Sequence, residues 1–217
     1  MFKYRSNELE LLDNETIPKA DLYLNLQELA VINKYLGGHQ TILRGLQQFK
    51  NVKSIVEIGS GGGDNLRAIQ KWNPSFQLSG VDLKQDCIDF SKTNSQSINF
   101  YCSDYQVFNK QADVIFNSLF CHHFKDEALV EMFKWMHENS KLGFIIGDLH
   151  RHWLAYYSIK SLSALFSKSY LLKNDAPLSV KRGFKKSELV NLLEKAGIKD
   201  YKIQWVWAFR YLIVIKK

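Results

Sequence analysis

Residues suited to binding and catalysis gather where runs of apolar residues end. The first such place is Ser54–Asp64, S-I-V-E-I-G-S-G-G-G-D, where a β-branched run breaks into four glycines within five positions. Glycine permits backbone angles that a Cβ forbids and lets a ligand approach the main chain closely. A strand, a glycine turn and a helix that begins near Asn65 are how a doubly wound sheet presents its backbone to a nucleotide-like cofactor.

The carboxylates around this turn restrict the cofactor. A dinucleotide fingerprint G-x-G-x-x-G/A fits Gly59 and Gly61, but its third position falls on Asp64. Glu57 adds a second carboxylate two residues before the first glycine. Two anionic side chains at a helix N-terminus would repel a pyrophosphate, whereas they suit a phosphate-free cofactor with a positive centre. S-adenosylmethionine, with its adenosine, sulfonium and amino-acid tail, is such a cofactor.

Two further apolar runs end in an acid. Phe76–Leu83 contains Asp82 at its end, where a carboxylate can accept hydrogen bonds from both ribose hydroxyls. The alternative is that Asp82 caps the helix that follows. Ile98–Asp104 ends in an acid that could accept from an adenine amino group, with Tyr105 against the ring. The alternative there is an exposed loop acid.

Histidines follow the next two runs. His122 and His123 come after Ala112–Ser118, and Asp148 and His150 end the run that begins at Lys141. Ligands bind at the carboxyl ends of strands in open α/β sheets, and histidine is suited to accept a proton from an oxygen nucleophile. We expect His123 to be the base, His150 the second candidate and Asp148 an orienting group. The alternative is that these histidines cap helices or line the pocket without proton transfer.

Metal binding and cysteine catalysis are not expected. The His122–His123 pair and Asp148 could be drawn as metal ligands, but adjacent side chains usually diverge and no second motif supports them. Cys121 could be a nucleophile, but we interpret it as a small buried apolar residue. The three cysteines are an odd number without metal-like spacing, which favours a reduced, cytoplasmic protein.

Length and composition favour a single domain, residues 1–217. The chain has 217 residues, of which 46% are apolar, enough for a core. The net charge of +7 permits an anionic partner without requiring one. The charged N-terminus contains no secretory signal, and no apolar run is long enough to span a bilayer.

Strands and helices alternate over residues 51–150, the predicted cofactor-binding core. Residues 1–50 are expected to form an N-terminal helical cap: a weakly ordered arm over 1–20, then two helices that begin near Asp21 and Gln40. The first helix is expected either to pack as scaffold or to close over the cofactor. Asn33 lies near Gly37 and Gly38, and a glycine pair beside a polar side chain can admit a ligand.

An aromatic-rich helical stretch, residues 153–172, interrupts this alternation. It could be a lid over an apolar substrate pocket, ordinary core or dimer packing, or a membrane-surface helix aided by nearby lysines. We favour a lid insertion over 151–180. The segment 181–217 then holds the basic turn Lys181–Lys186, a helix capped by Ser187 and two terminal strands that pair antiparallel.

From Ser54 to Lys217 the sequence resembles the class I S-adenosylmethionine-dependent methyltransferases. E-I-G-S-G-G-G-D resembles motif I, G-V-D-L the acidic strand-two motif, S-D-Y the adenine contact and A-D-V-I-F-N-S the strand-four motif. The resemblance implies a Rossmann-like α/β fold with a seven-stranded sheet ordered 3-2-1-4-5-7-6 and strand seven antiparallel. The cofactor contacts expected from the turn and the resemblance together are Glu57, Gly59, Ser60, Gly61, Gly63, Asp64, Asp82, Leu83, Asp104, Tyr105, Asn117 and Ser118.

The expected function is methyl transfer from S-adenosylmethionine to a small, largely apolar acceptor, most simply at oxygen. Three segments, S-L-F-C-H-H-F, G-D-L-H-R-H-W-L-A-Y-Y and S-V-K-R-G-F-K-K-S-E-L, also look like a bacterial subgroup associated with quinone rings or polyketides. A nucleic-acid methyltransferase is the main rival, favoured by Lys181–Lys186 but disfavoured because Asn117-Ser118-Leu119-Phe120 is not the N-P-P-Y type that clamps a flipped amine. A non-catalytic cofactor-binding protein is the second alternative.

Overall fold

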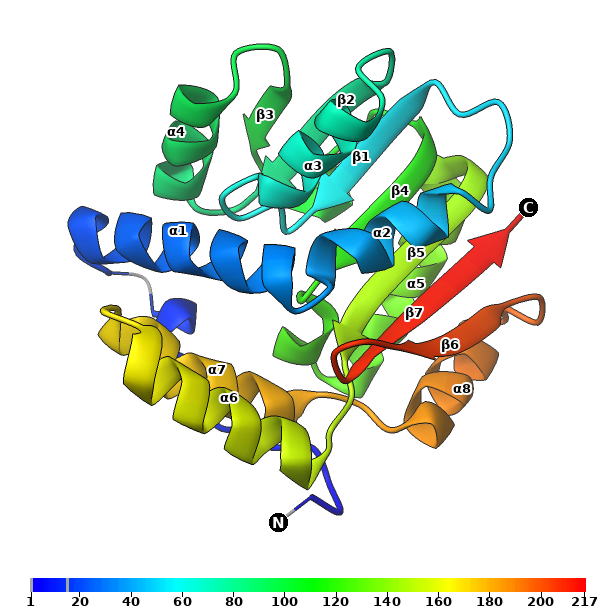
Figure 1. Ribbon diagram of the computed structural model, residues 1–217. Coiled ribbons are helices and arrows are strands. Elements are labelled where there is room, and N and C mark those ends of the chain that lie inside the picture. The colour runs from blue at the N-terminus through cyan, green and yellow to red at the C-terminus, as the bar shows by residue number, and fades with distance from the viewer. Residues whose placement is uncertain (1, 15) are drawn as a thin grey trace.

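A seven-stranded sheet forms the centre of the computed structural model, which describes residues 2–14 and 16–217 (Figure 1). The strand order is β3-β2-β1-β4-β5-β7-β6. β1 to β5 pair in parallel, and β7 runs antiparallel to both β5 and β6. The predicted order and the antiparallel seventh strand are confirmed. The strands are β1 (Ser54–Ile58), β2 (Gln77–Asp82), β3 (Asn99–Cys102), β4 (Ala112–Ser118), β5 (Ser140–Leu149), β6 (Lys202–Val206) and β7 (Arg210–Lys216).

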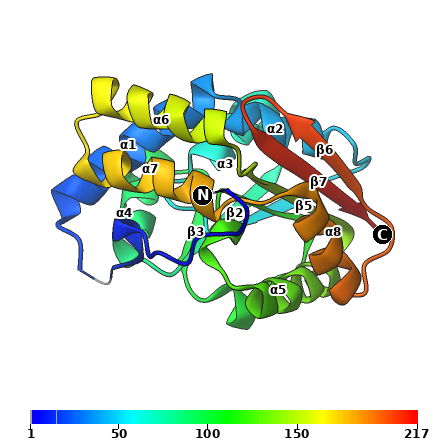
Figure 2. The same ribbon diagram turned by 90° about the horizontal axis from the view of Figure 1, so that it is seen from below.

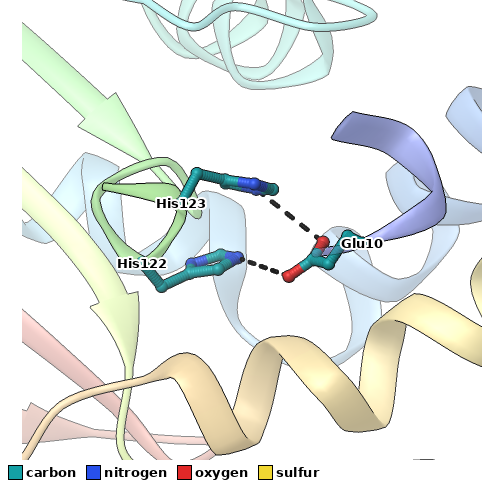
Figure 3. A group of neighbouring side chains, drawn as sticks. All are labelled: Glu10, His122 and His123. Atoms are coloured by element: carbon teal, nitrogen blue, oxygen red, sulfur yellow. Dashed lines mark ion pairs between the residues drawn. The ribbon is translucent and has the colours of Figure 1, made fainter. Parts of the chain in front are cut away.

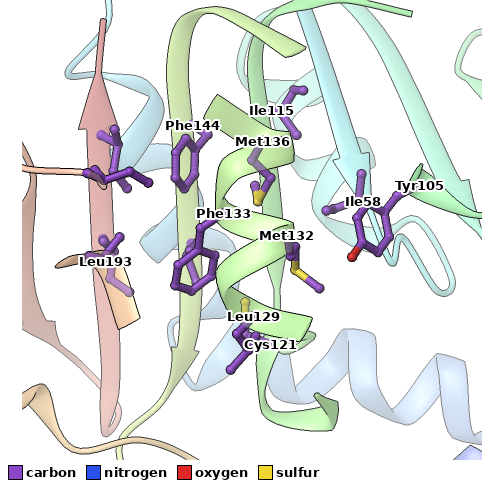
Figure 4. Close-up of a cluster of buried hydrophobic side chains, with 14 of the residues drawn as sticks. Ile58, Tyr105, Ile115, Cys121, Leu129, Met132, Phe133, Met136, Phe144 and Leu193 are labelled. Atoms are coloured by element: carbon purple, nitrogen blue, oxygen red, sulfur yellow. The ribbon is translucent and has the colours of Figure 1, made fainter. Parts of the chain in front are cut away.

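Helices cover both faces of the sheet, so its central strands are apolar on both sides. In β4, Val114, Ile115 and Phe116 are fully buried, as expected of a parallel strand between two helical layers. One layer contains α2 (Gly38–Leu46), α3 (Asp64–Trp72) and α4 (Gln85–Asn94), and the other contains α5 (Asp126–Asn139) and α8 (Lys186–Lys195). Figure 4 shows Phe133 and Met136 of α5 in the second layer's core.

Three helices lie at the carboxyl end of the parallel strands: α1 (Lys19–Tyr35), α6 (Trp153–Phe166) and α7 (Tyr170–Arg182). Figures 1 and 2 show α6 and α7 side by side beneath α1. The stretch predicted as helical, residues 153–172, therefore includes α6 and the start of α7, which form a helical hairpin. Its turn is held by Glu28 of α1, which accepts hydrogen bonds from Ser167 Oγ and Lys168 N at 2.5 and 2.7 Å.

The N-terminal arm, residues 2–14, is folded against the rest of the chain. Arg151 Nε donates to the carbonyl of Phe2 at 3.2 Å, and Arg182 Nη1 donates to the carbonyl of Glu8 at 3.1 Å. Glu10 is only 3% exposed. The prediction of a weakly ordered arm over 1–20 is wrong for the described part, since its partners lie far away in sequence; residues 1 and 15 fall outside it.

No helix of residues 2–14 and 16–217 combines the length and the apolar character needed to cross a membrane. The α6 helix instead has one face toward the interior, where Ala155 and Tyr156 are buried, and another on which Leu165 and Phe166 are exposed. The α6 helix is therefore buried on one face only.

Candidate active site

A cavity of about 410 Å³ lies at the carboxyl ends of β1 and β4. The glycine turn after β1 forms one end, and η3, the short helix Cys121–His123 after β4, forms the other. The walls between these ends are apolar, a composition and size that suit an organic ligand. They come from α1 (Leu26, Leu29, Ile32) and from the α6–α7 hairpin (Ile159, Leu162, Leu172).

The glycine turn has a backbone that side chains would obstruct. Gly59, Gly61 and Gly63 have φ values of 66°, 49° and 71°, in the left-handed region that favours glycine. A Cβ on Gly59 would lie 2.2 Å from the ring of Phe120. Gly59, Ser60 and Gly61, three of the expected cofactor contacts, line the cavity, whereas Gly63, the N-cap of α3, does not.

Two carboxylates give this end of the cavity its negative character. Glu57 is 1% exposed, its Oε1 accepts from Asn65 Nδ2 at 2.8 Å, and its Oε2 has no hydrogen-bond partner among the described residues. Burial and the neighbouring Asp64 raise the pKa of Glu57 well above its usual range. Burial has the largest single effect on the pKa of Asp64 and raises it. The hydrogen bond from His39 Nε2 at 2.7 Å, the charge of His39, a hydrogen bond from Asn33 and the charge of Arg67 together outweigh burial and lower the pKa below its usual value.

A buried arginine lies close to these acids. Arg210 lines the cavity and is 3% exposed, and its Nη2 donates to Asn33 Oδ1 at 3.4 Å. Its Nη1 is buried without a partner in the described part of the chain. Burial lowers the pKa of Arg210 to about 10. A guanidinium with a free donor binds carboxylates well, so this residue could hold an anionic group of a ligand.

Asp82 holds the backbone of the glycine turn by a hydrogen bond. Its two carboxylate oxygens accept hydrogen bonds from the backbone of Gly61 at 2.8 Å and of Lys84 at 2.9 Å. Burial raises the pKa of Asp82. The next residue, Leu83, is 68% exposed, and neither Asp82 nor Leu83 is part of the cavity wall.

Three other expected cofactor contacts lie away from the cavity. Asp104 caps the short helix η2 (Tyr105–Val107), accepting from Gln106 N at 2.9 Å. Tyr105 packs edge-on against Trp135 in the core, with ring centroids 5.3 Å apart. Asn117 turns toward α5, where its amide lies 3.5 Å from Met136 Sδ. Of the expected strand-four contacts, Ser118 alone lines the cavity. Spacing along a strand does not tell which face a side chain takes at its end.

The paired histidines form the polar end of the cavity. His122 Nδ1 lies 2.8 Å from Asp148 Oδ1, and His123 Nδ1 lies 2.8 Å from Asp13 Oδ1. Asp148 therefore orients His122 and not His123. The two rings lie 4.4 Å apart with an angle of 32° between their planes, and both point toward Glu10 (Figure 3). The expectation that adjacent histidine side chains diverge is wrong here, because η3 turns the backbone between them.

Glu10 faces both imidazoles from the arm. Its carboxylate oxygens lie 3.6 Å from His122 Nε2 and 3.8 Å from His123 Nε2 (Figure 3). Ser179 Oγ donates to Glu10 Oε1 at 2.8 Å. Burial raises the pKa of Glu10 to about 7, although His123, Ser179 and Arg182 lower it.

His150 is not part of this cluster. It lies outside the cavity wall, where Trp205 Nε1 donates to its Nδ1 at 3.3 Å and its ring contacts Tyr211. Burial and the nearby His152 lower the pKa of His150. Cys121 is fully buried and its Sγ donates to Asn117 Oδ1 at 3.3 Å, which agrees with the expected structural role.

Several polar residues of this end were not predicted from the sequence. Asp175, Ser179 and Arg182 lie on one face of α7 at spacings i, i+4 and i+7. Arg182, expected in a basic turn, is buried, and its Nε and Nη2 donate to the carbonyls of His122 and His123. The spacing of these three polar residues along one helix face was the signal that the sequence offered. The arm offered only the short acidic pattern from Glu10 to Asp13.

Comparisons with known proteins place the fold. Residues 55–143 match the family model for a methyltransferase domain. Human N-acetylserotonin methyltransferase, solved in complex with SAM, is 13% identical with a TM-score of 0.69, over 92% of this chain and 56% of that chain. A Nostoc punctiforme protein described as an O-methyltransferase is 13% identical with a TM-score of 0.67, over 90% of this chain and 60% of that chain.

The chain spans little more than half the length of these two proteins. It spans most of the plantazolicin methyltransferase BpumL, solved with SAH, which is 22% identical with a TM-score of 0.63 over 92% of this chain and 89% of that chain. At these TM-scores the chain shares the fold of the three proteins. The family match adds that residues 55–143, which contain the strand–turn–helix core, have the sequence pattern of a methyltransferase domain.

Proposed function

We propose that this protein transfers the methyl group of S-adenosylmethionine to an oxygen of a small, largely apolar acceptor. The observation that carries the proposal is one cavity that joins the glycine turn to the histidine pair. Methyl transfer requires an acceptor atom in line with the sulfonium methyl, and much of the rate comes from holding that alignment. A cavity shared by the cofactor and the acceptor can hold the two in that alignment.

The cofactor's charged groups match the side chains at the glycine end. Its sulfonium and ammonium are cationic and suit Asp64 and Glu57, whose Oε2 has no partner among the described residues. Its carboxylate suits the free Nη1 of Arg210. Asp82, which already holds the backbone of Gly61, would accept from the ribose. When bound, the cofactor supplies the methyl group, and these residues bind and orient it.

The acceptor would lie between α1 and the α6–α7 hairpin. The apolar walls suit an aromatic or polyketide-like body, and the polar end suits its nucleophilic oxygen. We propose His123 as the group that takes the proton, because its side chain is 23% exposed and Asp13 orients it. His122, held by Asp148, is nearly inaccessible at 2% and would act with it.

The nucleic-acid alternative loses part of its support. Of the basic segment Lys181–Lys186, Arg182 is buried and bonded to backbone carbonyls, and Lys181 Nζ lies 3.7 Å from Glu8. Those two cations are less available to phosphates. The second alternative, cofactor binding without catalysis, predicts affinity without turnover.

The test combines binding and turnover. Calorimetric titration should show S-adenosylhomocysteine binding and no NAD binding. Incubation with S-adenosylmethionine and a panel of apolar phenols should then release S-adenosylhomocysteine with at least one acceptor. His123→Ala should retain cofactor affinity and lower turnover about 100-fold or more, whereas His150→Ala should leave turnover unchanged. Turnover with RNA, or none with any small acceptor, would contradict the proposal.

A further inference from the structure

We infer that Glu10, His122 and His123 bind a divalent transition-metal ion, of which Zn²⁺ fits the donors best. Two imidazole nitrogens and one carboxylate are a common zinc-binding set. Potential ligand atoms of the three residues all lie within 4.8 Å of one another (Figure 3). The inference concerns the polar end of the proposed active site but does not require the proposed acceptor.

The hydrogen bonds of the two rings fix where their protons lie. An aspartate is ionised near neutral pH, since its ordinary pKa is about 4, and an ionised carboxylate can only accept. Asp148 and Asp13 are each 2.8 Å from a histidine Nδ1, so each Nδ1 carries a proton. In the neutral ring the opposite Nε2 is then a bare acceptor. Both Nε2 atoms point their lone pairs toward Glu10.

The space between these acceptors is too wide for hydrogen bonds and suits an ion. The distances from Glu10 oxygens to the two Nε2 atoms are 3.6 and 3.8 Å, beyond the usual hydrogen-bond range. Two ligands of a tetrahedral ion at about 2.0–2.1 Å lie about 3.3 Å apart. A contraction of a few tenths of an ångström would therefore bring each Nε2 to the ligand–ligand distance from Glu10 that a tetrahedral ion requires, while the ligand atoms of the two histidines already lie within 4.8 Å of one another.

The surroundings match those of known metal-binding histidines. Such histidines donate their second N–H to a carboxylate, which fixes the ring and raises its basicity. Asp148 is itself held by Leu149 N at 2.7 Å, and Asp13 by Arg182 Nη1 at 2.7 Å. Both second-sphere carboxylates are thus fixed.

The charge of the cluster also favours a cation. Glu10, Asp13 and Asp148 surround the two rings, and Arg182 can neutralise only one of them. Arg182 Nη1 lies 3.9 Å from Glu10 but donates to Glu8 O and Asp13. Among the described residues, the carboxylate of Glu10 therefore accepts no hydrogen bond from an arginine or lysine side chain.

An ion here would change the part played by the histidines. Three protein ligands leave a position for an oxygen of the acceptor, and coordination lowers the pKa of a bound hydroxyl. The O–H bond would then break with its electrons left on oxygen and its proton passed to water. His123 would hold the ion instead of taking the proton.

The test is metal binding by the whole chain. Protein dialysed against EDTA is titrated with Zn²⁺ in the presence of a chromogenic chelator, and Co²⁺ is added separately to record the visible absorption of a four-coordinate ion. We expect about one equivalent bound, weakened at least 100-fold in Glu10→Gln and His123→Ala, and weakened 10- to 100-fold in Asp13→Asn. His150→Ala, a histidine outside the cavity, should bind as the wild type does.

S-adenosylhomocysteine titration of every variant shows that it is folded. Equal Zn²⁺ affinity of the wild type and of Glu10→Gln would overturn the metal site. If the EDTA-treated protein takes up no Zn²⁺ but binds S-adenosylhomocysteine and methylates at the full rate, the metal proposal falls while the proposed function stands. If untreated protein holds Zn²⁺ but does not bind S-adenosylhomocysteine, the proposed function falls while the metal site stands.

Discussion

The two ends of the cavity are built in different ways. At the glycine end, Glu57, the turn and Asn65 belong to one strand–turn–helix segment, and their contacts are between near neighbours. At the polar end, Glu10, His122, Asp148 and Ser179 come from four separate segments. The turn of the first end belongs to one βα unit, to which Asp82, His39 and Arg210 are added from β2, α2 and β7, whereas the second end has no such local unit and needs the arm, two strand ends and α7 to meet.

The ends also differ in how well their polar atoms are bonded. Glu57 Oε2 and Arg210 Nη1 lack partners in the part of the chain that the structure describes. Around the histidines, by contrast, Asp13, Asp148 and Arg182 are each held by several groups. The unpaired oxygen of Glu57 and the unpaired nitrogen of Arg210 can bind charged groups of a ligand. The side chains of the polar end are instead held in place by other protein groups.

Of the changes considered, Arg182→Met should have the largest effect, a decrease in the free energy of unfolding. The change removes the donors to His122 O, His123 O and Asp13, and that carboxylate keeps only its contacts with His123 and the backbone N–H of Glu10. Breaking a fully buried pair costs about 3–5 kcal/mol, and because the Asp13 side chain is 24% exposed we expect a loss near the lower limit. Chemical denaturation should show this loss. Lys181→Met, a neighbouring cation on the same helix, is the control, and an equal loss there would show that Arg182 has no special part.

Asp82→Ala should have the largest effect on cofactor affinity while sparing the polar end. It removes the acceptor for the backbone N–H of Gly61, and the turn loses its support. We expect S-adenosylhomocysteine affinity to fall about 100-fold or more, the equivalent of about 2.7 kcal/mol. Zn²⁺ affinity measured in the same variant should not change. If both affinities fall together, the two ends are not independent.

Arg210→Met should weaken the cofactor less. A hydrogen bond to a charged group contributes about 1.5–3 kcal/mol, so S-adenosylhomocysteine affinity should fall about 10- to 100-fold. Adenosine lacks the carboxylate, and its affinity should be the same in the variant as in the wild type. A parallel loss of adenosine affinity would mean that Arg210 supports the cavity wall and not the ligand's tail.

Glu57 should give cofactor binding a modest pH dependence. Burial and the charge of Asp64 raise the pKa of Glu57 in the folded protein. The contribution of Glu57 to the stability of the fold is therefore complete below its ordinary pKa of 4.5, and it is lost as the pH rises through the folded pKa. A cationic ligand favours the ionised form, so affinity should increase with pH across the same window, by up to about tenfold per unit. The slope measured by titration should vanish in Glu57→Gln.

The glycine end could largely be predicted from the sequence because its signals are local. A β-branched run, glycines with positive φ and a following helix specify β1, the turn and α3 together, and strand ends specify Asp82. The sheet order followed from the resemblance and is confirmed. Side-chain direction at strand ends is not local information, which is why Tyr105 and Asn117 were expected in the cavity but lie in the core.

The polar end could be predicted only in part. His122, His123 and Asp148 stood out as polar residues at strand ends. Glu10 did not, because it becomes a buried group only through α7 and η3, over 100 residues away. The hairpin turn between α6 and α7 depends in the same way on Glu28 of α1. Contacts between distant segments leave no periodic pattern in either partner.

Several hydrogen bonds that hold the N-terminal arm are made by its backbone. Arg151 holds the carbonyls of Phe2 and Lys3, Arg182 holds that of Glu8, and Ser6 N donates to Lys181 O. These four hydrogen bonds need only the backbone of the arm. The side chain of Arg5 adds hydrogen bonds to the carbonyls of Arg182, His122 and Phe124 and an ion pair with Asp126, and the ring of Phe2 packs edge-on against Tyr156. A substitution at Lys3, where the bonded group is the carbonyl, should therefore displace the arm less than a substitution at Arg5.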